Sequence, residues 1–281
     1  MPAGTMLSWE PEKICAFIRE AGYDAIELQA VLVNMGDDPA GFRNRLITAV
    51  RDNHLVISEL VASRDFVVLD ETEHKTNIES VINNLHIAAD MGIGVVNLFT
   101  GPQPWIANPV IIGRQISALQ AWELVYKAFD RIVPVAEQLK IRLAVENVFG
   151  MLCHDFFTHQ YFNSQYNSAY LGVNLDPSHD VLYGNTDMHF LVNGWGKKIF
   201  HIHLKDAVGI PEMGRFTFPL LGEGIVDWSS FFTALGEIHY EGCMSVEFES
   251  WGYIKTALGG KHEGTARLSR ELIEKLLPPV S

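Results

Sequence analysis

The chain has 281 residues, with 21 Lys and Arg against 34 Asp and Glu, which gives a formal net charge of −13. This acidic balance argues against a nucleic-acid partner, because phosphates are bound through clustered Lys and Arg. No apolar run approaches the ~18 residues of a membrane-spanning helix, so we expect no membrane partner. The N-terminal residues have neither the basic nor the apolar part of a secretory signal, and we expect a cytoplasmic location.

Three cysteines, Cys15, Cys153 and Cys243, are widely spaced and odd in number. They fit neither a disulfide framework nor a CxxC metal motif, so we interpret them as small buried apolar side chains. The run from Cys153 to Asp155 is a poor nucleophilic site, because neighbouring residues point in different directions in any regular element.

Helical and strand-like segments alternate along the chain. The first helix is predicted over Pro11–Ala21 and ends before Gly22, a typical residue just past a helix, and Asp24–Leu28 follows as a short strand. Further helices are predicted over Pro39–Asp52, Glu71–Met91, Gly113–Leu139, His154–Asn167, Asp187–Gly194, Trp228–His239 and Glu263–Leu277. The remaining strands are predicted over Leu55–Val61, Val95–Phe99, Arg142–Asn147, Leu171–Asp176, Ile199–Leu204 and Met244–Glu249.

Strands separated by helices of this length predict right-handed βαβ units and a parallel sheet. A single α/β domain over residues 1–281, a (β/α)8 TIM barrel, fits the pattern best. Its first strand is weak, because Met1–Trp9 contains Pro2 and Gly4; the strand is short and irregular, or the chain begins within it. An open doubly wound sheet is the alternative, but no GxGxxG follows a strand where a dinucleotide would need it.

In such a barrel the active site lies at the carboxyl ends of the strands. Each polar residue there has a plain structural alternative, such as an ion pair, a buried histidine or a helix cap. Their presence on four successive strands favours one divalent-metal site instead, although ligand type alone does not choose the metal. The last four strands end in Glu146-Asn147, Asp176-Pro-Ser-His179, His201-Ile-His203-Leu-Lys205-Asp206 and Glu247-Phe-Glu249, and the earlier ones end more weakly in Glu27, Glu59, Asn97 and Thr100.

These residues resemble the xylose isomerase-like barrels, which include sugar-phosphate isomerases and epimerases and ketose 3-epimerases. The resemblance covers nearly the whole chain, and its motifs together are specific for the superfamily but say little about the substrate. The motifs are Gly22–Leu28, Ala144–Asn147, Leu175–His179, His201–Asp206, Leu221–Trp228 and Val246-Glu247.

The resemblance implies one divalent metal ion, Mn²⁺ before Mg²⁺, Co²⁺ or Zn²⁺. Its ligands would be Glu146, Asp176, His203 and Glu247. Glu249 shares a strand face with Glu247, so the ligand on this strand is one of the two.

The resemblance also implies substrate-binding residues. His179 matches the family's substrate histidine, and we assign Lys205 to the substrate as well. The family's substrate arginine lies a few residues after the histidine ligand. The first arginine after His203 is Arg215, across a longer loop, and we assign the substrate-binding role to it.

In the resembled epimerases two glutamates act as acid and base, which assigns catalysis to Glu146 and Glu247. A carboxylate on each face of an enediolate can remove a proton and return one, while the metal stabilises the charge. The sequence therefore predicts a sugar isomerase or epimerase acting on a keto-sugar.

Three other functions remain open. A lyase, such as an inosose dehydratase or an enzyme that cleaves 3-keto-glycosides, would keep the site, with Lys205 or His179 protonating the departing oxygen. A nuclease acting at apurinic sites would need additional histidines and a basic face. A barrel that only binds sugar would leave the four ligands idle.

A small carbohydrate is the expected partner, and the absence of a glycine-rich phosphate cradle favours an unphosphorylated one. The apolar stretch Phe216–Leu221 favours an interface in a homodimer or homotetramer. Aromatic residues near the strand ends would form an apolar wall for the sugar: Trp105, Phe149, Phe156, Phe157, Tyr183, Trp251 and Tyr253.

Overall fold

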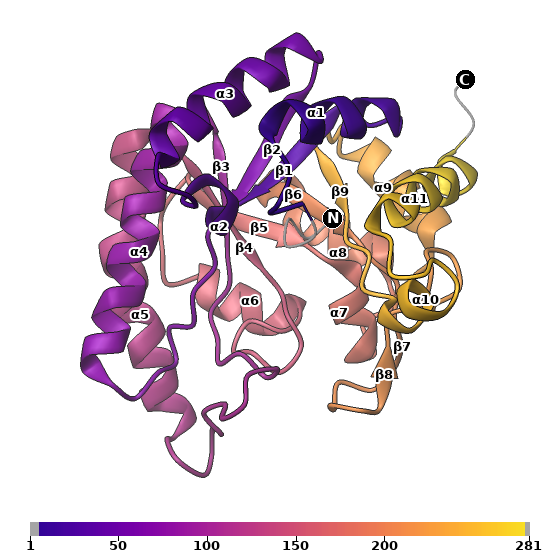
Figure 1. The fold of residues 1–281 in the computed structure, drawn as a ribbon. Helices are drawn as coiled ribbons and strands as arrows, with labels where there is room; N and C mark the ends of the chain where they lie inside the picture. The colour runs from indigo at the N-terminus through magenta and orange to yellow at the C-terminus, as the bar shows by residue number, and fades with distance from the viewer. Residues whose placement is uncertain (1–5, 279–281) are drawn as a thin grey trace.

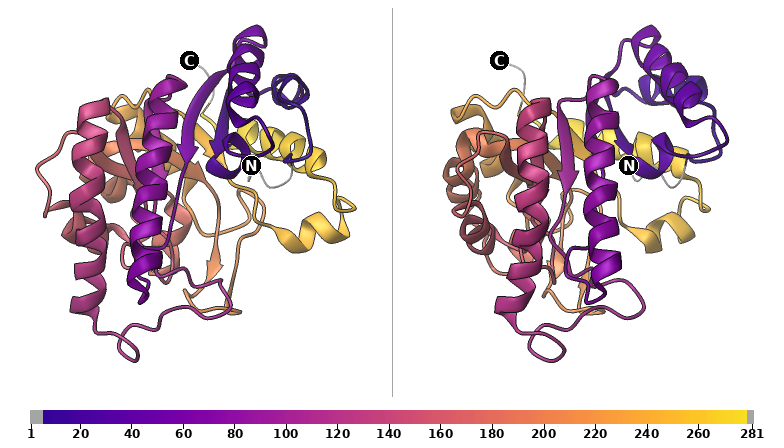
Figure 2. Two further views of the ribbon diagram at one scale, coloured as in Figure 1. Left: turned by 60° about the vertical axis from the view of Figure 1, so that its left-hand side comes forward. Right: turned by 90° about the vertical axis from the view of Figure 1, so that its left-hand side faces the viewer.

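The computed structural model describes residues 6–278. Seven parallel strands form one sheet, in the order β1-β2-β3-β4-β5-β6-β9, which curves into a nearly closed barrel with helices outside it (Figures 1 and 2). The predicted TIM barrel is confirmed. The strands of the barrel are β1 (Ala25–Gln29), β2 (Val56–Val61), β3 (Val95–Leu98), β4 (Arg142–Glu146), β5 (Leu171–Leu175), β6 (Ile199–Leu204) and β9 (Met244–Val246).

Helices connect successive strands, and a two-stranded antiparallel hairpin, β7 (Val208–Gly209) with β8 (Phe216–Thr217), follows β6. The short helices α2, α7 and α10 and this hairpin were not predicted. The helices are α1 (Pro11–Glu20), α2 (Ala30–Val33), α3 (Pro39–Asp52), α4 (Glu71–Asp90), α5 (Ala118–Leu139), α6 (Phe156–Asn163), α7 (Pro177–Leu182), α8 (Met188–Trp195), α9 (Trp228–Glu237), α10 (Trp251–Thr256) and α11 (His262–Leu276), with a 3-10 turn η2 (Gly196–Lys198).

Two helices begin later than hydrophobic periodicity predicted. In each of them a capping side chain determines the first helical residue. Helix α5 begins at Ala118, not Gly113, because Ser117 forms a capping box: its hydroxyl accepts from the backbone N–H of Gln120, and the Gln120 side chain accepts from that of Ser117. Asp155 caps α6 in the same way, which delays that helix to Phe156.

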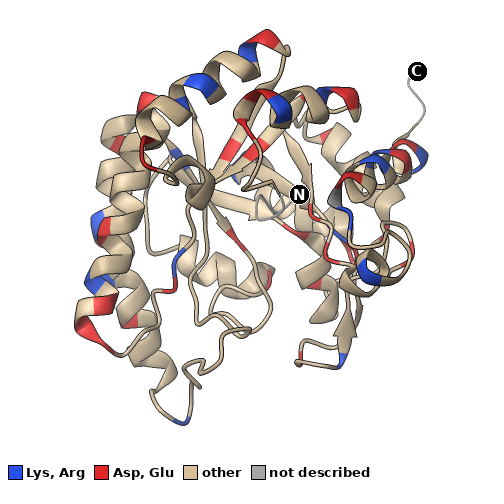
Figure 3. Cartoon of the chain, in the orientation of Figure 1, with Lys and Arg blue, Asp and Glu red and all other residues tan. Residues whose placement is uncertain are grey.

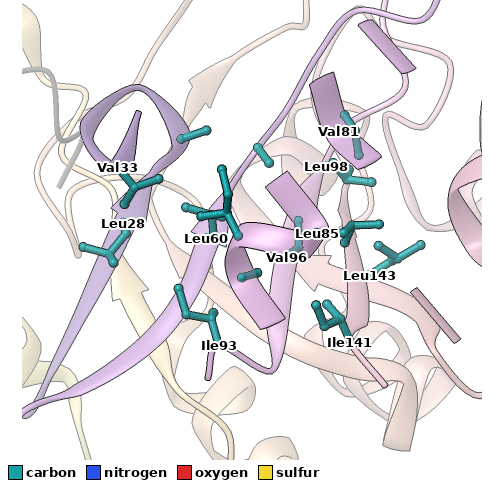
Figure 4. Close-up of a cluster of buried hydrophobic side chains, with 14 of the residues drawn as sticks. Leu28, Val33, Leu60, Val81, Leu85, Ile93, Val96, Leu98, Ile141 and Leu143 are labelled. Atoms are coloured by element: carbon teal, nitrogen blue, oxygen red, sulfur yellow. The ribbon is translucent and has the colours of Figure 1, made fainter. Parts of the chain in front are cut away.

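Strand residues alternate between the helices and the barrel interior, as the two-residue period of a strand requires. Most helix-facing side chains are aliphatic and buried, and they supply the main hydrophobic core under α4 and its neighbours (Figure 4). This layer includes Leu28, Leu60, Val96, Leu98 and Leu143 from the strands and Val81 and Leu85 from α4.

The barrel interior is mostly polar. A small apolar cluster of Val95, Ala144 and Phe200 lies on β3, β4 and β6. An extra residue in β6 shifts the register against β5, so that Val173 pairs with Ile199 and Asn174 with His201. Gly172 gives the Phe200 ring its space, because a Cβ on this glycine would lie 2.6 Å from the ring.

Strands β1 and β9 face each other across the one opening in the sheet. Among the described residues, β1 pairs with β2 and β9 with β6, and a hollow of about 250 Å³ separates them, lined by Ala25–Glu27 and Met244–Val246. The segment expected to form a weak first strand falls here in part: residues 1–5 lie outside the described residues, and residues 6–9 form turns and bends.

Charged residues of both signs lie on the outer helices, among them α3, α4 and α11 (Figure 3). Within residues 6–278, no helix is both long and apolar enough to cross a membrane. Two of the cysteines, Cys15 and Cys153, are buried as expected, and Cys243 is half-buried.

The loop after β6 is organised by one buried carboxylate. Asp206 is 1% exposed and accepts hydrogen bonds from the backbone N–H groups of Gly222, Gly224 and Val226 and from Trp228 Nε1. This carboxylate therefore ties the chain leaving β6 to the start of α9.

Replacing this carboxylate tests how much it stabilises the fold. Asp206→Ala leaves several buried donors without an acceptor, so the free energy of unfolding should fall by about 3–5 kcal/mol. The matched control is Asp227→Ala, which removes the exposed N-cap of α9 and should cost about 1 kcal/mol. Urea unfolding measures both values, and equal losses would contradict the role given to Asp206.

Candidate metal centre

The carboxyl ends of the strands surround a pocket of about 640 Å³. Its floor carries carboxylates, imidazoles and one ammonium, and its walls carry aromatic rings. A pocket of this size and mixed lining is typical of a small-molecule site. The polar residues that line it include Glu27, Arg64, Glu146, His179, His203, Lys205, Glu247 and Glu249.

The four predicted ligands lie together at this floor. Glu146, Asp176, His203 and Glu247 each offer one ligand atom, and these atoms all lie within 4.8 Å of one another; we call this set the mouth cluster. His203 Nδ1 is 2.9 Å from Glu146 Oε1 and 3.7 Å from Glu247 Oε2.

A divalent metal ion fits the mouth cluster. Asp176 is fully buried, and its Oδ2 faces the Lys205 ammonium at 3.0 Å and His179 Nε2 at 3.5 Å, so it is an ionised donor directed at the other three ligand atoms. Carboxylate and imidazole donors suit Mn²⁺, Mg²⁺, Co²⁺ or Zn²⁺, so the identity of the ion stays a prediction.

Two asparagines hold the ligands in position. Asn97 Nδ2 donates to Glu146 Oε2 at 3.2 Å. Asn147 accepts from the backbone N–H of Asp176 and donates to its carbonyl and to Asp180 Oδ2, which fixes the start of α7. The positioning role of Asn147 was not predicted, although the Glu-Asn pair at the end of β4 was the available signal.

Lys205 lies among the carboxylates. Its Nζ is 3.0 Å from Asp176 Oδ2, 2.5 Å from Glu247 Oε2 and 3.3 Å from Glu249 Oε2, and it lies over the ring of Phe218. Burial opposes its charge, but these carboxylates raise the pKa of Lys205 well above its usual range. Lys205, predicted as a substrate-binding residue, thus also neutralises carboxylates at the candidate metal site.

The two carboxylates after β9 differ in their surroundings. Glu247 belongs to the mouth cluster, and Glu249 does not. Burial alone would raise the pKa of Glu247, but Lys205 and His203 lower it. Burial raises the pKa of Glu249 to about 7 despite the nearby ammonium.

His179 is a buried, neutral imidazole in the pocket wall. Burial, and then the charge of Lys205, lower its pKa well below 6.5. Its Nδ1 accepts from the backbone N–H of Phe149, and its ring lies 5.6 Å from those of Phe149 and Phe218. The remaining nitrogen, Nε2, is 3.5 Å from Asp176 Oδ2 and is placed to donate a hydrogen bond.

The structure does not bring Arg215 to the pocket. Its side chain is 62% exposed and pairs with Glu212 at 2.7 Å, because the β7–β8 hairpin carries it outward. Arg64, which follows β2, is the arginine that lines the pocket among the described residues, and sequence analysis missed it. No motif marked Arg64, since its position depends on the path of the chain after β2.

Aromatic rings form one wall of the pocket, as predicted, but only some of the predicted aromatic residues belong to it. Trp105, Phe149 and Trp251 line the pocket, whereas Phe156 packs into the core. Phe157, Tyr183 and Tyr253 are not among the lining residues. Phe216 and Phe218, from the stretch expected to form a subunit interface, complete the wall.

A family model described as a xylose isomerase-like TIM barrel matches residues 15–276, and the chain therefore belongs to that family. Inosose dehydratase from Clostridium beijerinckii is 24% identical over 158 residues, which span 50% of this chain and 52% of that protein. The chain thus matches only about half the length of this relative.

Solved structures show the same fold. The IolI protein with a bound zinc atom has 18% identity and a TM-score of 0.75, covering 94% of this chain and 92% of its own. L-ribulose 3-epimerase has 20% identity and a TM-score of 0.69, covering 95% of this chain and 88% of its own.

The assignment of ligands is tested by two matched carboxylate-to-amide variants. Asp176→Asn removes a charged ligand from a fully buried position, so the affinity of the mouth cluster for Mn²⁺ should fall by about 100-fold or more. Glu249→Gln should leave this affinity within a few fold, because Glu249 lies outside the cluster. Titration of the chelator-treated chain with Mn²⁺ measures both; a larger loss in Glu249→Gln would exchange the roles of Glu247 and Glu249.

Proposed function

We propose that this xylose isomerase-like barrel is a divalent-metal-dependent isomerase or epimerase of a keto-sugar or related keto-polyol. The supporting observation is the position of Glu146 and Glu247 in one pocket. Glu146 ends β4 and Glu247 follows β9, so the two carboxylates enter from strands separated by β5 and β6. Two such carboxylates can address opposite faces of a planar intermediate.

A divalent ion held by the mouth cluster would act as a Lewis acid on the substrate carbonyl, which makes the neighbouring C–H group more acidic. Lys205 keeps Glu247 ionised, so Glu247 is available to accept that proton. Asn97 orients Glu146 for the proton transfer on the other face. His179 is placed to donate a hydrogen bond to a substrate oxygen, and the aromatic wall packs against the C–H face of the sugar.

Dehydration is the second candidate reaction. The position of the Glu249 carboxyl favours it. Its carboxyl lines the same pocket, lies outside the mouth cluster and pairs with Lys205. After a base removes the proton beside the carbonyl, a β-hydroxyl leaves as water if an acid supplies one proton. Glu249 is positioned as that acid, and the resemblance to an inosose dehydratase supports the same outcome.

The central step is tested by proton exchange with solvent. The Mn²⁺-loaded chain should incorporate deuterium from D₂O next to the carbonyl of a substrate from a panel of ketoses and inososes. Glu146→Gln should lower kcat by about 10²–10⁴-fold, because it removes both a ligand charge and a base. Mass spectrometry of recovered sugars measures the exchange. A Glu146→Gln chain with near-normal turnover would refute the acid–base pair.

Glu249→Gln separates the two candidate reactions. If the protein is a dehydratase, this variant should slow the release of water about 100-fold while exchange of the C–H proton continues. If it is an isomerase or epimerase, exchange and product formation should both stay within a few fold of the unmodified chain. NMR of the product mixture distinguishes an epimer from an unsaturated ketone.

A further inference from the structure

A second group of metal-binding side chains lies deeper in the barrel. Glu27 of β1, Glu59 of β2, and His201 and His203 of β6 each offer one ligand atom within 4.8 Å of the others; we call this set the inner cluster. Glu59 and His201 are both 0% exposed. Both clusters share His203, and the other three members of the inner cluster take no part in the proposed reaction.

Glu59 is the member of the inner cluster whose burial has no evident compensation. Both of its carboxylate oxygens are buried without a hydrogen-bond partner in the described part of the chain. The nearest polar atoms are imidazole nitrogens, His203 Nε2 at 3.3 Å and His201 Nδ1 at 3.4 Å from Glu59 Oε1. A carboxylate buried in this way needs a cation or a donor to replace its lost hydration.

No lysine or arginine supplies that charge within residues 6–278. The ion pairs of Lys205 go to Asp176, Glu247 and Glu249, at the barrel mouth. Glu27 Oε2 faces the same imidazole as Glu59, at 3.2 Å from His203 Nε2. Two carboxylates therefore converge on one imidazole edge, and neither is paired with a lysine or arginine among the described residues.

The histidines present suitable nitrogens to the inner cluster. His203 directs Nδ1 to the mouth cluster and Nε2 to the inner one. His201 Nε2 lies 3.2 Å from Ser245 Oγ, a partner of the kind that fixes the ring of a metal-binding histidine, and this leaves Nδ1 toward Glu59. Asn174 Oδ1, 3.2 Å from the same Nδ1, would accept a hydrogen bond from Nδ1–H, and a cation bound at Nδ1 would take the place of that proton.

We propose that the inner cluster binds a second divalent cation through Glu27, Glu59, His201 and the Nε2 atom of His203. Two carboxylates with two imidazoles form a donor set for Zn²⁺, Co²⁺ or Mn²⁺, and four such ligands match the coordination number of Zn²⁺. Glu27 lines both the main pocket and the hollow between β1 and β9, which gives the ion two routes of entry. If both clusters were occupied, His203 would release its remaining ring proton to solvent and offer Nδ1 to one ion and Nε2 to the other.

Metal stoichiometry tests this proposal without any assay of activity. The full chain, stripped with a chelator and then equilibrated with Zn²⁺, should hold about two ions per chain by elemental analysis after gel filtration. Glu59→Gln should hold about one, and Asp176→Asn about one at the other cluster. The matched control, Glu249→Gln, keeps about two because its carboxylate lies outside both clusters.

The possible outcomes decide between one and two sites. A single ion in the unmodified chain at saturating Zn²⁺, or two ions in a folded Glu59→Gln chain, would overturn the proposal. If Glu59→Gln fails to fold, Glu27→Gln serves instead, because its side chain reaches the edge of the pocket. The number of Zn²⁺ ions per chain does not depend on catalysis. If the protein proved not to catalyse the proposed reaction, the expected metal counts would stay the same.

Discussion

The structure depends on concentrating buried negative charge at one end of the barrel. Among the described residues, six carboxyl groups gather around the Lys205 ammonium and the imidazoles of His179, His201 and His203; they are those of Glu27, Glu59, Glu146, Asp176, Glu247 and Glu249. Removing so many carboxylates from water is costly unless cations or protons compensate them. Burial raises the pKa of Glu59 to about 8. The carboxylates of Glu146 and Glu27 raise the pKa of His203 well above its usual range, although burial opposes this.

The hydrophobic core between strands and helices offsets the free-energy cost of burying these carboxylates. Each strand places aliphatic residues under the helices and polar residues inside, so one alternating pattern supplies both the stabilising core and the functional interior. The bulge in β6 adapts the pattern locally, since it lets Phe200 pack with Val95 and Ala144 while His201 and His203 still face the carboxylates. Asn97 and Asn147 then hold ligands that would otherwise repel one another.

Sequence analysis predicted those features that depend on local pattern. Strand ends, helix periodicity and short motifs were sufficient for the barrel and for a set of ligands that the structure brings together. Features that depend on the path of a loop were missed: Arg215 was placed in the site, although its hairpin carries it outward, and Arg64 and Phe218 were not placed there. Glu59 was ranked as a weak candidate because nothing along the chain reveals that β2 lies across the barrel from His201 and His203.

His203 links the two halves of this charged interior. A neutral imidazole has one free lone pair and one N–H, so it serves one metal ion and donates to a carboxylate on its other side. With an ion in the mouth cluster alone, Nδ1 would be the ligand atom and Nε2–H would donate to Glu27, an arrangement that would strengthen the ligand. With ions in both clusters, that proton would leave and the second cation would replace its charge. The carboxylates of the inner cluster would therefore influence a metal ion at the mouth in either state, through a single ring.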